Sequence, residues 1–184
     1  MSRFNKALFL DRDGVVNIDH GYVYEPDKFE FVPGVFAACK AFVDAGYKLI
    51  IVTNQSGIGR GYYSEADFHI LTHWMISQFA EHQVTVADVY FCPHHPKKAL
   101  PAYLKLCDCR KPAAGMLLQG IAEHHVDVTQ SIMVGDKLSD MQAASKAAIG
   151  TRVLVRSGQK FDALAIDSAD YVCDSLADLP ALLL

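Results

Sequence analysis

No apolar run in the sequence approaches the ~20 residues that a membrane-spanning helix needs. Repeats, low-complexity tracts and linkers are also missing, so we expect one domain over residues 1–184. No signal-peptide core stands near Met1, so we expect a protein that is not exported. The formal net charge is -4, which offers no basic track for a nucleic-acid backbone. These absences argue against a membrane protein and against a nucleic-acid-binding protein.

Cysteine is scarce, with five residues, an odd number, of which three stand close to histidines. A secreted disulfide scaffold usually carries an even set of cysteines. We therefore expect reduced thiols, a metal site and a cytoplasmic protein. With 184 residues, 51% of them hydrophobic, the chain is long enough to bury a sizeable core. We further expect a monomer.

Short apolar runs alternate with amphipathic segments along the chain. We expect buried strands at residues 7–10, 49–52, 89–91, 131–134 and 152–155, and a short edge strand at 171–172. We expect helices at residues 35–45, 64–83, 115–125, 140–148 and 176–183, and a flexible loop at the glycine-rich segment 57–61. Strands that alternate with helices form a mostly parallel sheet that is covered on both faces. The predicted fold class is therefore α/β, with a doubly wound sheet.

Two carboxylates, Asp11 and Asp13, follow the first predicted strand. Alternate residues of an extended segment point the same way, so both can face one site, although Asp-Gly is also common in caps and turns. If the strand order reverses beside the first strand, Asp136 at the end of the fourth strand joins them. Three carboxylates repel one another unless a cation binds, and oxygen ligands favour Mg2+. The pattern predicts a magnesium site made of these aspartates.

Complementary groups stand near other strand ends. Thr53 brings a hydroxyl at the end of the second strand, while Arg110 and Lys111 bring positive charge. A carboxylate nucleophile, Mg2+, a hydroxyl and a lysine are what phosphoryl transfer through an aspartyl-phosphate requires. The residues therefore favour a phosphoryl-transfer site.

A second constellation offers three thiols and an imidazole, which is enough for a closed tetrahedral zinc site. Its members are Cys92, Cys107, Cys109 and either His94 or His95. A structural zinc ion would brace the loop between them and aim the following two basic residues into the site. The alternative is a loop with unrelated cysteines.

The segments D-R-D-G-V-V, V-T-N-Q-S, C-R-K-P and G-D-K-L-S-D follow one another in this order. Together they resemble the four motifs of the haloacid dehalogenase (HAD) superfamily. The resemblance implies that Asp11 is the nucleophile and Asp13 the general acid/base, and that Thr53 and Lys111 contact the phosphoryl group. It also implies Mg2+ on Asp11, Asp13 and Asp136. A dehalogenase has no leaving oxygen to protonate, so the presence of Asp13 favours a phosphatase.

Within the superfamily, the cysteine–histidine loop resembles that of the zinc-containing phosphatases close to histidinol phosphatase. That resemblance selects His94 over His95 and implies a structural Zn2+ on Cys92, His94, Cys107 and Cys109. It also implies that the loops after the strands bind the substrate. The residues implied are Asp19, His20, Gly21, Tyr22, Asn54, Gln55, Ser56, Arg110 and Lys137.

The segments between the motifs are too short for a folded cap domain, so we expect an open site. The resemblance implies a small phosphorylated sugar as the substrate, and a second phosphate on it would give Arg110 a bidentate partner. Arg110 in a surface salt bridge is the alternative. The competing functions are a histidinol-phosphate phosphatase and a catalytically idle, zinc-braced binding domain. The idle domain is disfavoured because every acidic and basic motif position is filled.

Overall fold

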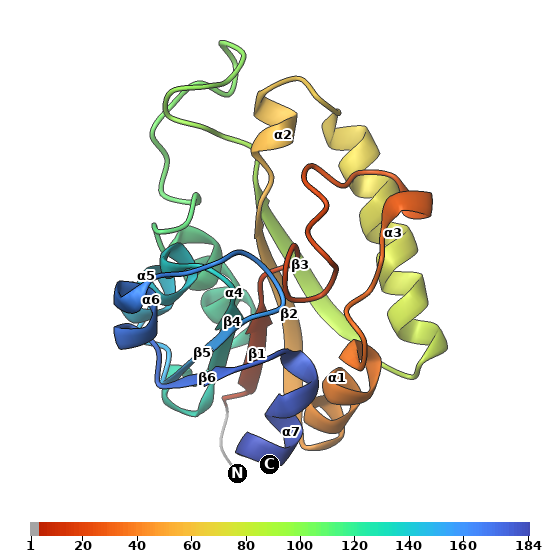
Figure 1. Cartoon of the computed structure of the whole chain (residues 1–184), viewed down its shortest axis with the longest axis vertical. Coiled ribbons are helices and arrows are strands. Elements are labelled where there is room, and N and C mark those ends of the chain that lie inside the picture. The colour runs from red at the N-terminus through yellow and green to blue at the C-terminus, as the bar shows by residue number, and fades with distance from the viewer. Residues whose placement is uncertain (1–3) are drawn as a thin grey trace.

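A six-stranded, all-parallel sheet forms the centre of the molecule, with the strand order β3-β2-β1-β4-β5-β6. The computed structural model describes residues 4–184 (Figure 1). The strands are β1 (Lys6–Leu10), β2 (Tyr47–Asn54), β3 (Val86–Cys92), β4 (Ile132–Gly135), β5 (Thr151–Val155) and β6 (Tyr171–Cys173). The predicted α/β fold with a doubly wound sheet is confirmed.

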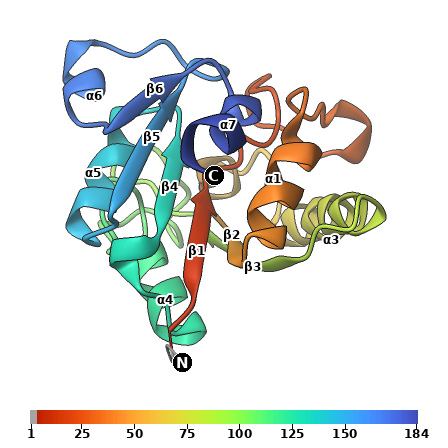
Figure 2. The same cartoon turned by 90° about the horizontal axis from the view of Figure 1, so that it is seen from below.

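Helices cover both faces of the sheet (Figure 2). The helices are α1 (Val35–Asp44), α2 (Ser56–Gly59), α3 (Glu65–Glu81), α4 (Gly115–His124), α5 (Leu138–Lys146), α6 (Ala163–Asp167) and α7 (Leu179–Leu183). Three short 3-10 turns span Pro26–Lys28, Val128–Gln130 and Leu176–Asp178. One face of β1 packs on α1, α3 and α7, and the other face packs on α4 and α5. In the described chain, no helix is both long and apolar enough to cross a membrane.

The strand order reverses at β1, because β2 lies on one side of it and β4 on the other. The register pairs Leu10 with Ile51 of β2 and with Val134 of β4. The Asp11 N–H then donates to the carbonyl of Val134 at 3.0 Å, just beyond the strand. The carboxyl ends of β1, β2 and β4 therefore meet at one crevice, where ligands bind in sheets of this kind.

The prediction of a flexible loop at residues 57–61 is wrong for the first part of this segment. There α2 makes a helical turn, and Gly57, Ile58 and Gly59 are buried. A Cβ atom on Gly57 would come within 2.2 Å of the Tyr63 ring, and one on Gly59 within 2.4 Å of the Pro93 carbonyl. These glycines therefore permit close packing rather than mobility.

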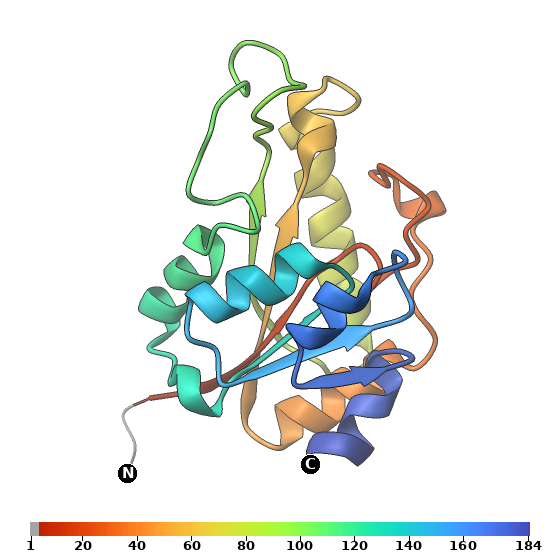
Figure 3. The ribbon, with the colours of Figure 1, turned by 60° about the vertical axis from the view of Figure 1, so that its left-hand side comes forward.

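A long loop, residues 93–109, follows β3 and projects beyond the strand ends beside α2 (Figure 3). We call it the Cys/His loop. The Leu100 N–H donates to the Gly59 carbonyl at 2.6 Å, and the Tyr103 hydroxyl donates to Glu65 at 3.0 Å. These contacts fasten the loop to the rim of the crevice.

Candidate active site

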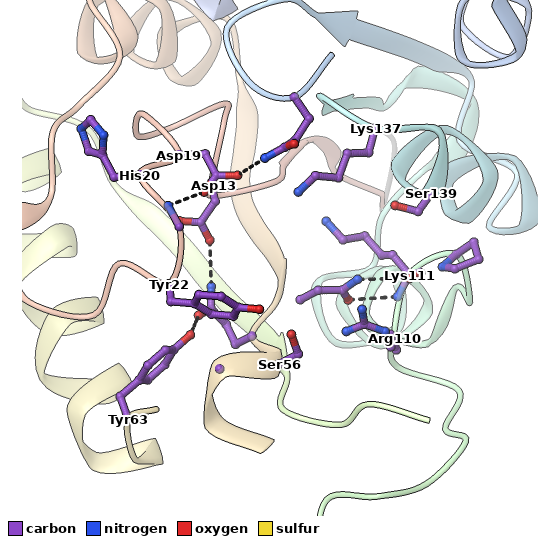
Figure 4. A pocket seen from close by; sticks show the side chains of 16 residues that line it. Asp13, Asp19, His20, Tyr22, Ser56, Tyr63, Arg110, Lys111, Lys137 and Ser139 are labelled. Atoms are coloured by element: carbon purple, nitrogen blue, oxygen red, sulfur yellow. Dashed lines mark hydrogen bonds between the residues drawn. The ribbon is translucent and has the colours of Figure 1, made fainter. Parts of the chain in front are cut away.

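A cavity of ≈ 790 Å³ opens at the carboxyl ends of the central strands (Figure 4). The predicted residues that line it are Asp13, Asp19, His20, Gly21, Tyr22, Asn54, Gln55, Ser56, Arg110, Lys111 and Lys137. Three further predicted residues are buried behind the lining and contact it, and we call them the floor: Asp11 contacts Lys111, Thr53 contacts Gln55 and Asp136 contacts Gln159. Lys137, Lys111 and Arg110 lie on one side of the cavity, while Asp13, Asp19 and Tyr22 lie on the other (Figure 4). The cavity thus presents a cationic wall.

Asp11 stands at the end of β1, where only 5% of its surface is exposed. Its Oδ1 accepts from the Arg12 N–H at 2.8 Å and contacts Lys111 Nζ at 2.9 Å. Burial raises the pKa of Asp11 to about 6, although the Lys111 charge pulls in the opposite direction. The two donors therefore orient the Asp11 carboxylate. The Lys111 charge offsets only part of the free-energy cost of burying it.

Lys111 follows the Cys/His loop, and its side chain extends to Asp11 at the floor of the cavity. Its Nζ lies 2.7 Å from Asp140 Oδ1 as well as 2.9 Å from Asp11 Oδ1, and it donates to the Val52 carbonyl at 2.8 Å. Burial alone would lower the pKa of Lys111, but the two carboxylate charges outweigh it and raise the pKa. The ammonium group stays charged, and it offsets the negative charge beneath the cavity.

Asp136 follows β4 and forms a buried carboxylate cluster with Asp11 and Asp140, whose ligand atoms all lie within 4.8 Å of one another. Asp136 Oδ1 is buried without a hydrogen-bond partner, and burial raises the pKa of this carboxyl to about 8. A Cβ atom on Gly158 would lie 2.1 Å from Asp136 Oδ2, so backbone packs directly against it. An orphaned carboxylate oxygen beside a second carboxylate fits a hard divalent cation such as Mg2+.

The Asp13 carboxylate, predicted as a further Mg2+ ligand, is held by neighbouring side chains outside this cluster. Its Oδ1 accepts from Arg12 Nη2 at 2.9 Å and from Asn17 at 3.0 Å, and its Oδ2 accepts from Gln55 at 3.0 Å. Arg12 is a buried cation beside it, and alternation along β1 could not reveal this competing partner. Burial would raise the pKa of Asp13, yet the Arg12 charge and these hydrogen bonds hold it below its usual value.

Gln55 ties two functional side chains together. Its Nε2 donates to Thr53 Oγ1 at 2.8 Å and to Asp13 Oδ2 at 3.0 Å, while its Oε1 accepts from the buried hydroxyl of Tyr63. The Tyr63 ring stacks on Tyr24 with centroids 5.0 Å apart. Sequence reasoning missed Tyr63, because an aromatic residue in a turn gives no sign of the amide that it holds.

Asn54, predicted to bind the substrate, lines the cavity and also pairs with the backbone of Lys111. Its Nδ2 donates to the Lys111 carbonyl at 3.1 Å, and its Oδ1 accepts from the Lys111 N–H at 3.0 Å. Arg110 donates from Nη1 to the His94 carbonyl at 3.3 Å. Both basic residues are thereby held between the end of β2 and the Cys/His loop.

The predicted zinc ligands converge. Cys92, His94, Cys107 and Cys109 place their ligand atoms within 4.8 Å of one another. The thiols of Cys92 and Cys107 are 3.5 Å apart, and His94 Nδ1 lies 3.4 Å from the Cys109 thiol. His95 is not a member, since its Nδ1 accepts from two backbone N–H groups of its own loop. Three thiols and one imidazole are a donor set that fits a closed zinc site.

The loop of residues 17–22 forms the remaining wall, and Gln159, which sequence reasoning missed, touches it. Gln159 Nε2 donates to Asp19 Oδ2 at 2.7 Å, and the Gln159 N–H donates to Asp136 Oδ2 at 2.7 Å. Ser139 and Pro112 also line the cavity without having been predicted. A glutamine in the turn after the fifth strand carries no motif, and only the topology brings it to the site.

Comparison with known proteins identifies relatives. A sequence profile of the HAD-hydrolase-like family matches residues 108–179. The D-glycero-beta-D-manno-heptose-1,7-bisphosphate 7-phosphatase of Salmonella typhi is 50% identical over 181 residues, which cover 98% of this chain and 96% of that protein. The chain belongs to this family of HAD phosphatases. The heptose-bisphosphate 7-phosphatase of Photorhabdus laumondii is 52% identical over 174 residues, which cover 95% of this chain and 93% of that protein.

Solved structures of HAD phosphatases share the fold. The D,D-heptose 1,7-bisphosphate phosphatase from B. bronchiseptica, complexed with magnesium and phosphate, is 31% identical and superposes with a TM-score of 0.83. The alignment covers 97% of each chain. A HAD-like phosphatase from Mesorhizobium loti is 32% identical, with a TM-score of 0.84 over 98% of this chain and 87% of that chain. The heptose-bisphosphate 7-phosphatase family thus matches this chain in sequence and in fold.

Proposed function

We propose that the chain hydrolyses the C7 phosphate of D-glycero-beta-D-manno-heptose 1,7-bisphosphate, in the synthesis of the heptose precursor of lipopolysaccharide. The observation that carries the proposal is about 50% identity to 7-phosphatases over nearly the whole chain. The cavity supports it, because a carboxylate, a buried lysine and a second carboxylate converge beneath a cationic wall.

Asp11 is the proposed nucleophile. Its carboxylate oxygen attacks phosphorus, so that a bond from Asp11 to phosphorus forms while the bond from phosphorus to the sugar oxygen breaks. Asp13 donates a proton to the departing oxygen. Asp13 then removes a proton from water, whose oxygen attacks the aspartyl-phosphate and releases inorganic phosphate with Asp11 restored. The low pKa of free Asp13 rises when a phosphate dianion binds beside it, because like charges disfavour ionisation.

Mg2+ is the proposed cofactor, and Asp11, Asp13 and Asp136 would hold it. When bound, it neutralises charge on these carboxylates and on the phosphoryl oxygens. The Asp13 carboxylate, which Arg12, Asn17 and Gln55 orient by hydrogen bonds, also has the acid/base role. Lys111 and the Thr53 hydroxyl would contact the phosphoryl group from the floor, and Lys137 would contact it from the cationic wall.

The depth of the site supports removal of the C7 phosphate. The reacting phosphorus must reach Asp11, which is almost entirely buried below the cavity. A phosphate on an exocyclic primary carbon extends from the sugar ring and can reach that depth. The anomeric phosphate sits directly on the ring, and we place it near Arg110 at the rim, where bidentate contact is available.

The remaining parts of the proposal concern the whole chain. We propose a single phosphatase domain over residues 1–184 that works as a monomer in the cytoplasm, where thiols stay reduced. We also propose one structural Zn2+ on Cys92, His94, Cys107 and Cys109. The free state of all five cysteines is compatible with both.

The test is phosphate release in the presence of Mg2+ from three substrates side by side. They are heptose 1,7-bisphosphate, fructose 1,6-bisphosphate and histidinol phosphate. We expect the heptose bisphosphate to have the highest kcat/KM by at least an order of magnitude. Preference for histidinol phosphate would contradict the proposed substrate, and no release from any of the three would favour an idle binding domain.

A further inference from the structure

A tether connects the floor of the cavity to the loop that covers one side of it. The Gln159 main-chain N–H donates to Asp136 Oδ2 at 2.7 Å, and its side-chain Nε2 donates to Asp19 Oδ2 at 2.7 Å. A single residue therefore contacts both a proposed Mg2+ ligand and the loop of residues 17–22. Figure 4 shows the second hydrogen bond as a dashed line that ends at Asp19.

The floor end of this tether is rigid. Backbone at Gly158 packs so closely on Asp136 that a Cβ atom would lie 2.1 Å from Oδ2. The Ser157 hydroxyl donates to the Gly14 carbonyl at 2.7 Å, which fastens the same turn to the segment after β1. The side chain of Gln159 therefore extends from a closely packed turn, and its length limits how far Asp19 can move while the hydrogen bond is kept.

The loop end needs such support. Gly21 and Tyr22 have φ values of 80° and 53°, and a non-glycine residue adopts this left-handed region only at a cost. Asp19 Oδ1 accepts from the Gly21 N–H at 3.0 Å, so Asp19 organises this bend with one oxygen while its other oxygen accepts from Gln159. Tyr22 is 47% exposed, with its ring centroid 4.8 Å from that of Tyr62 and 5.9 Å from the Arg60 guanidinium, so the tip is only partly packed.

We propose that Gln159 is a positioning residue that holds the substrate loop, residues 17–22, in its binding conformation. The inference rests on the proposed sugar-bisphosphate phosphatase activity, because the loop lines the cavity where the sugar would lie. Gln159 takes no part in the chemistry. Its loss should therefore weaken binding of a substrate that reaches the loop more than it slows the reaction.

The experiment compares Gln159→Ala, Gln159→Lys and Gln159→Glu on heptose 1,7-bisphosphate and on p-nitrophenyl phosphate, which is too small to span the cavity. For Gln159→Ala we expect KM for the bisphosphate to rise on the order of fivefold, because the one hydrogen bond that is lost is exposed to solvent, with kcat within about twofold. The rise in KM for p-nitrophenyl phosphate should be smaller. Gln159→Lys keeps a donor for Asp19 and should restore KM, whereas Gln159→Glu repels Asp19 and should be worse than alanine.

Two further measurements separate positioning from general loss of structure. Hydrogen–deuterium exchange of the peptide that covers residues 17–22 should accelerate in Gln159→Ala while the melting temperature stays within about 2 °C. A double-mutant cycle with Asp19→Ala should show that the two losses on kcat/KM are not additive. Gln119→Ala is the matched control, because Gln119 donates to the Glu123 carboxylate at 2.9 Å on the surface of α4. It should change neither the exchange of residues 17–22 nor kcat/KM.

The proposed role of Gln159 is contradicted if Gln159→Ala leaves the KM ratio of the two substrates and the exchange of the loop unchanged. It is also contradicted if the double-mutant cycle is additive. An equal fall of kcat on both substrates would also overturn it, because that result would place Gln159 in the chemical step. Failure of the proposed function would look different. The wild-type protein would then release no phosphate from the bisphosphate, and the exchange of the loop would still decide the tether.

Discussion

At the scale of residues, the site depends on buried charges that offset one another. Lys111 lies between Asp11 and Asp140, at 2.9 and 2.7 Å, and its raised pKa reflects the two carboxylates that outweigh burial. Asp136 lacks such a counter-charge at comparable distance, since Lys137 Nζ is 3.9 Å from its Oδ1. The floor therefore has two carboxylates, Asp11 and Asp140, that share one ammonium group, and a third, Asp136, without a close counter-charge.

Asp11→Asn should abolish turnover, because an amide cannot attack phosphorus and binds a cation poorly. We expect kcat on p-nitrophenyl phosphate to fall by roughly 10⁴-fold or more, as for loss of other covalent nucleophiles. Steady-state kinetics with saturating Mg2+ measure this. Asp44→Asn, which removes an exposed carboxylate paired with Lys40, is the control and should behave as wild type. Substantial turnover by Asp11→Asn would rule out the aspartyl-phosphate route.

Asp136 should also make stability depend on pH when Mg2+ is absent. Burial raises its pKa from 3.8 to about 8, so the folded state holds a proton that the unfolded state has released over this interval. The free energy of unfolding should therefore fall as pH rises from about 4 to 8. Compared with Asp136→Asn, the wild type should lose on the order of 1–3 kcal/mol in Mg2+-free urea titrations, because solvent and relaxation reduce the effect.

Saturating Mg2+ should reverse that trend, since the ion binds the ionised carboxylates and stabilises the folded state by mass action. The Asp136→Asn protein should gain much less from Mg2+. Parallel pH profiles for the two proteins, with or without the ion, would contradict the assignment of Asp136 to the cation.

At the scale of elements, the Cys/His loop links a metal site to the catalytic floor. Arg110 and Lys111 directly follow Cys109, and Arg110 also bonds the backbone at His94. The loop has few buried apolar residues of its own, and Leu100, Leu104 and Leu106 are exposed. A bound Zn2+ would supply the order that a core does not.

Cys107→Ser should therefore lower stability and weaken substrate binding together. We expect metal analysis to show about one Zn2+ per wild-type chain and much less in the variant, with a melting temperature several degrees lower. KM should rise because Arg110 and Lys111 lose their fixed backbone. Cys173→Ser is the matched control, since that thiol lies outside the cluster and bonds the Ser175 carbonyl at 3.4 Å. Zinc content equal in the two variants would refute the ligand set.

The elements that the sequence predicts well are those with a strong apolar period. The central strands and α1, α3, α4 and α5 occur where the pattern places them, give or take a few residues at the ends. Of the short elements, β6 and α7 were predicted, whereas α2 and α6 were not. The turn α2 and the five-residue helix α6 owe their shape to tertiary contacts, such as the Tyr63 ring against Gly57, that no local period encodes.

At the scale of the whole molecule, topology decides which residues meet. Reversal of the strand order at β1 brings Asp11 beside Asp136, although the two residues are 125 positions apart in the sequence. The motifs predicted that Asp11 and Asp136 lie close together, because each motif follows a strand. The sequence could not show that Arg12 holds the Asp13 carboxylate, or that Gln159 returns to the site, because both depend on where side chains point.

The most direct test of the proposed C7 specificity follows the two phosphates of one substrate separately. Phosphorus NMR of heptose 1,7-bisphosphate incubated with the protein and Mg2+ resolves the C1 and C7 signals. We expect the C7 signal to decay into inorganic phosphate while the C1 signal remains, as heptose 1-phosphate accumulates. Loss of the C1 signal first, or equal loss of both, would contradict a site in which only the exocyclic phosphate reaches Asp11.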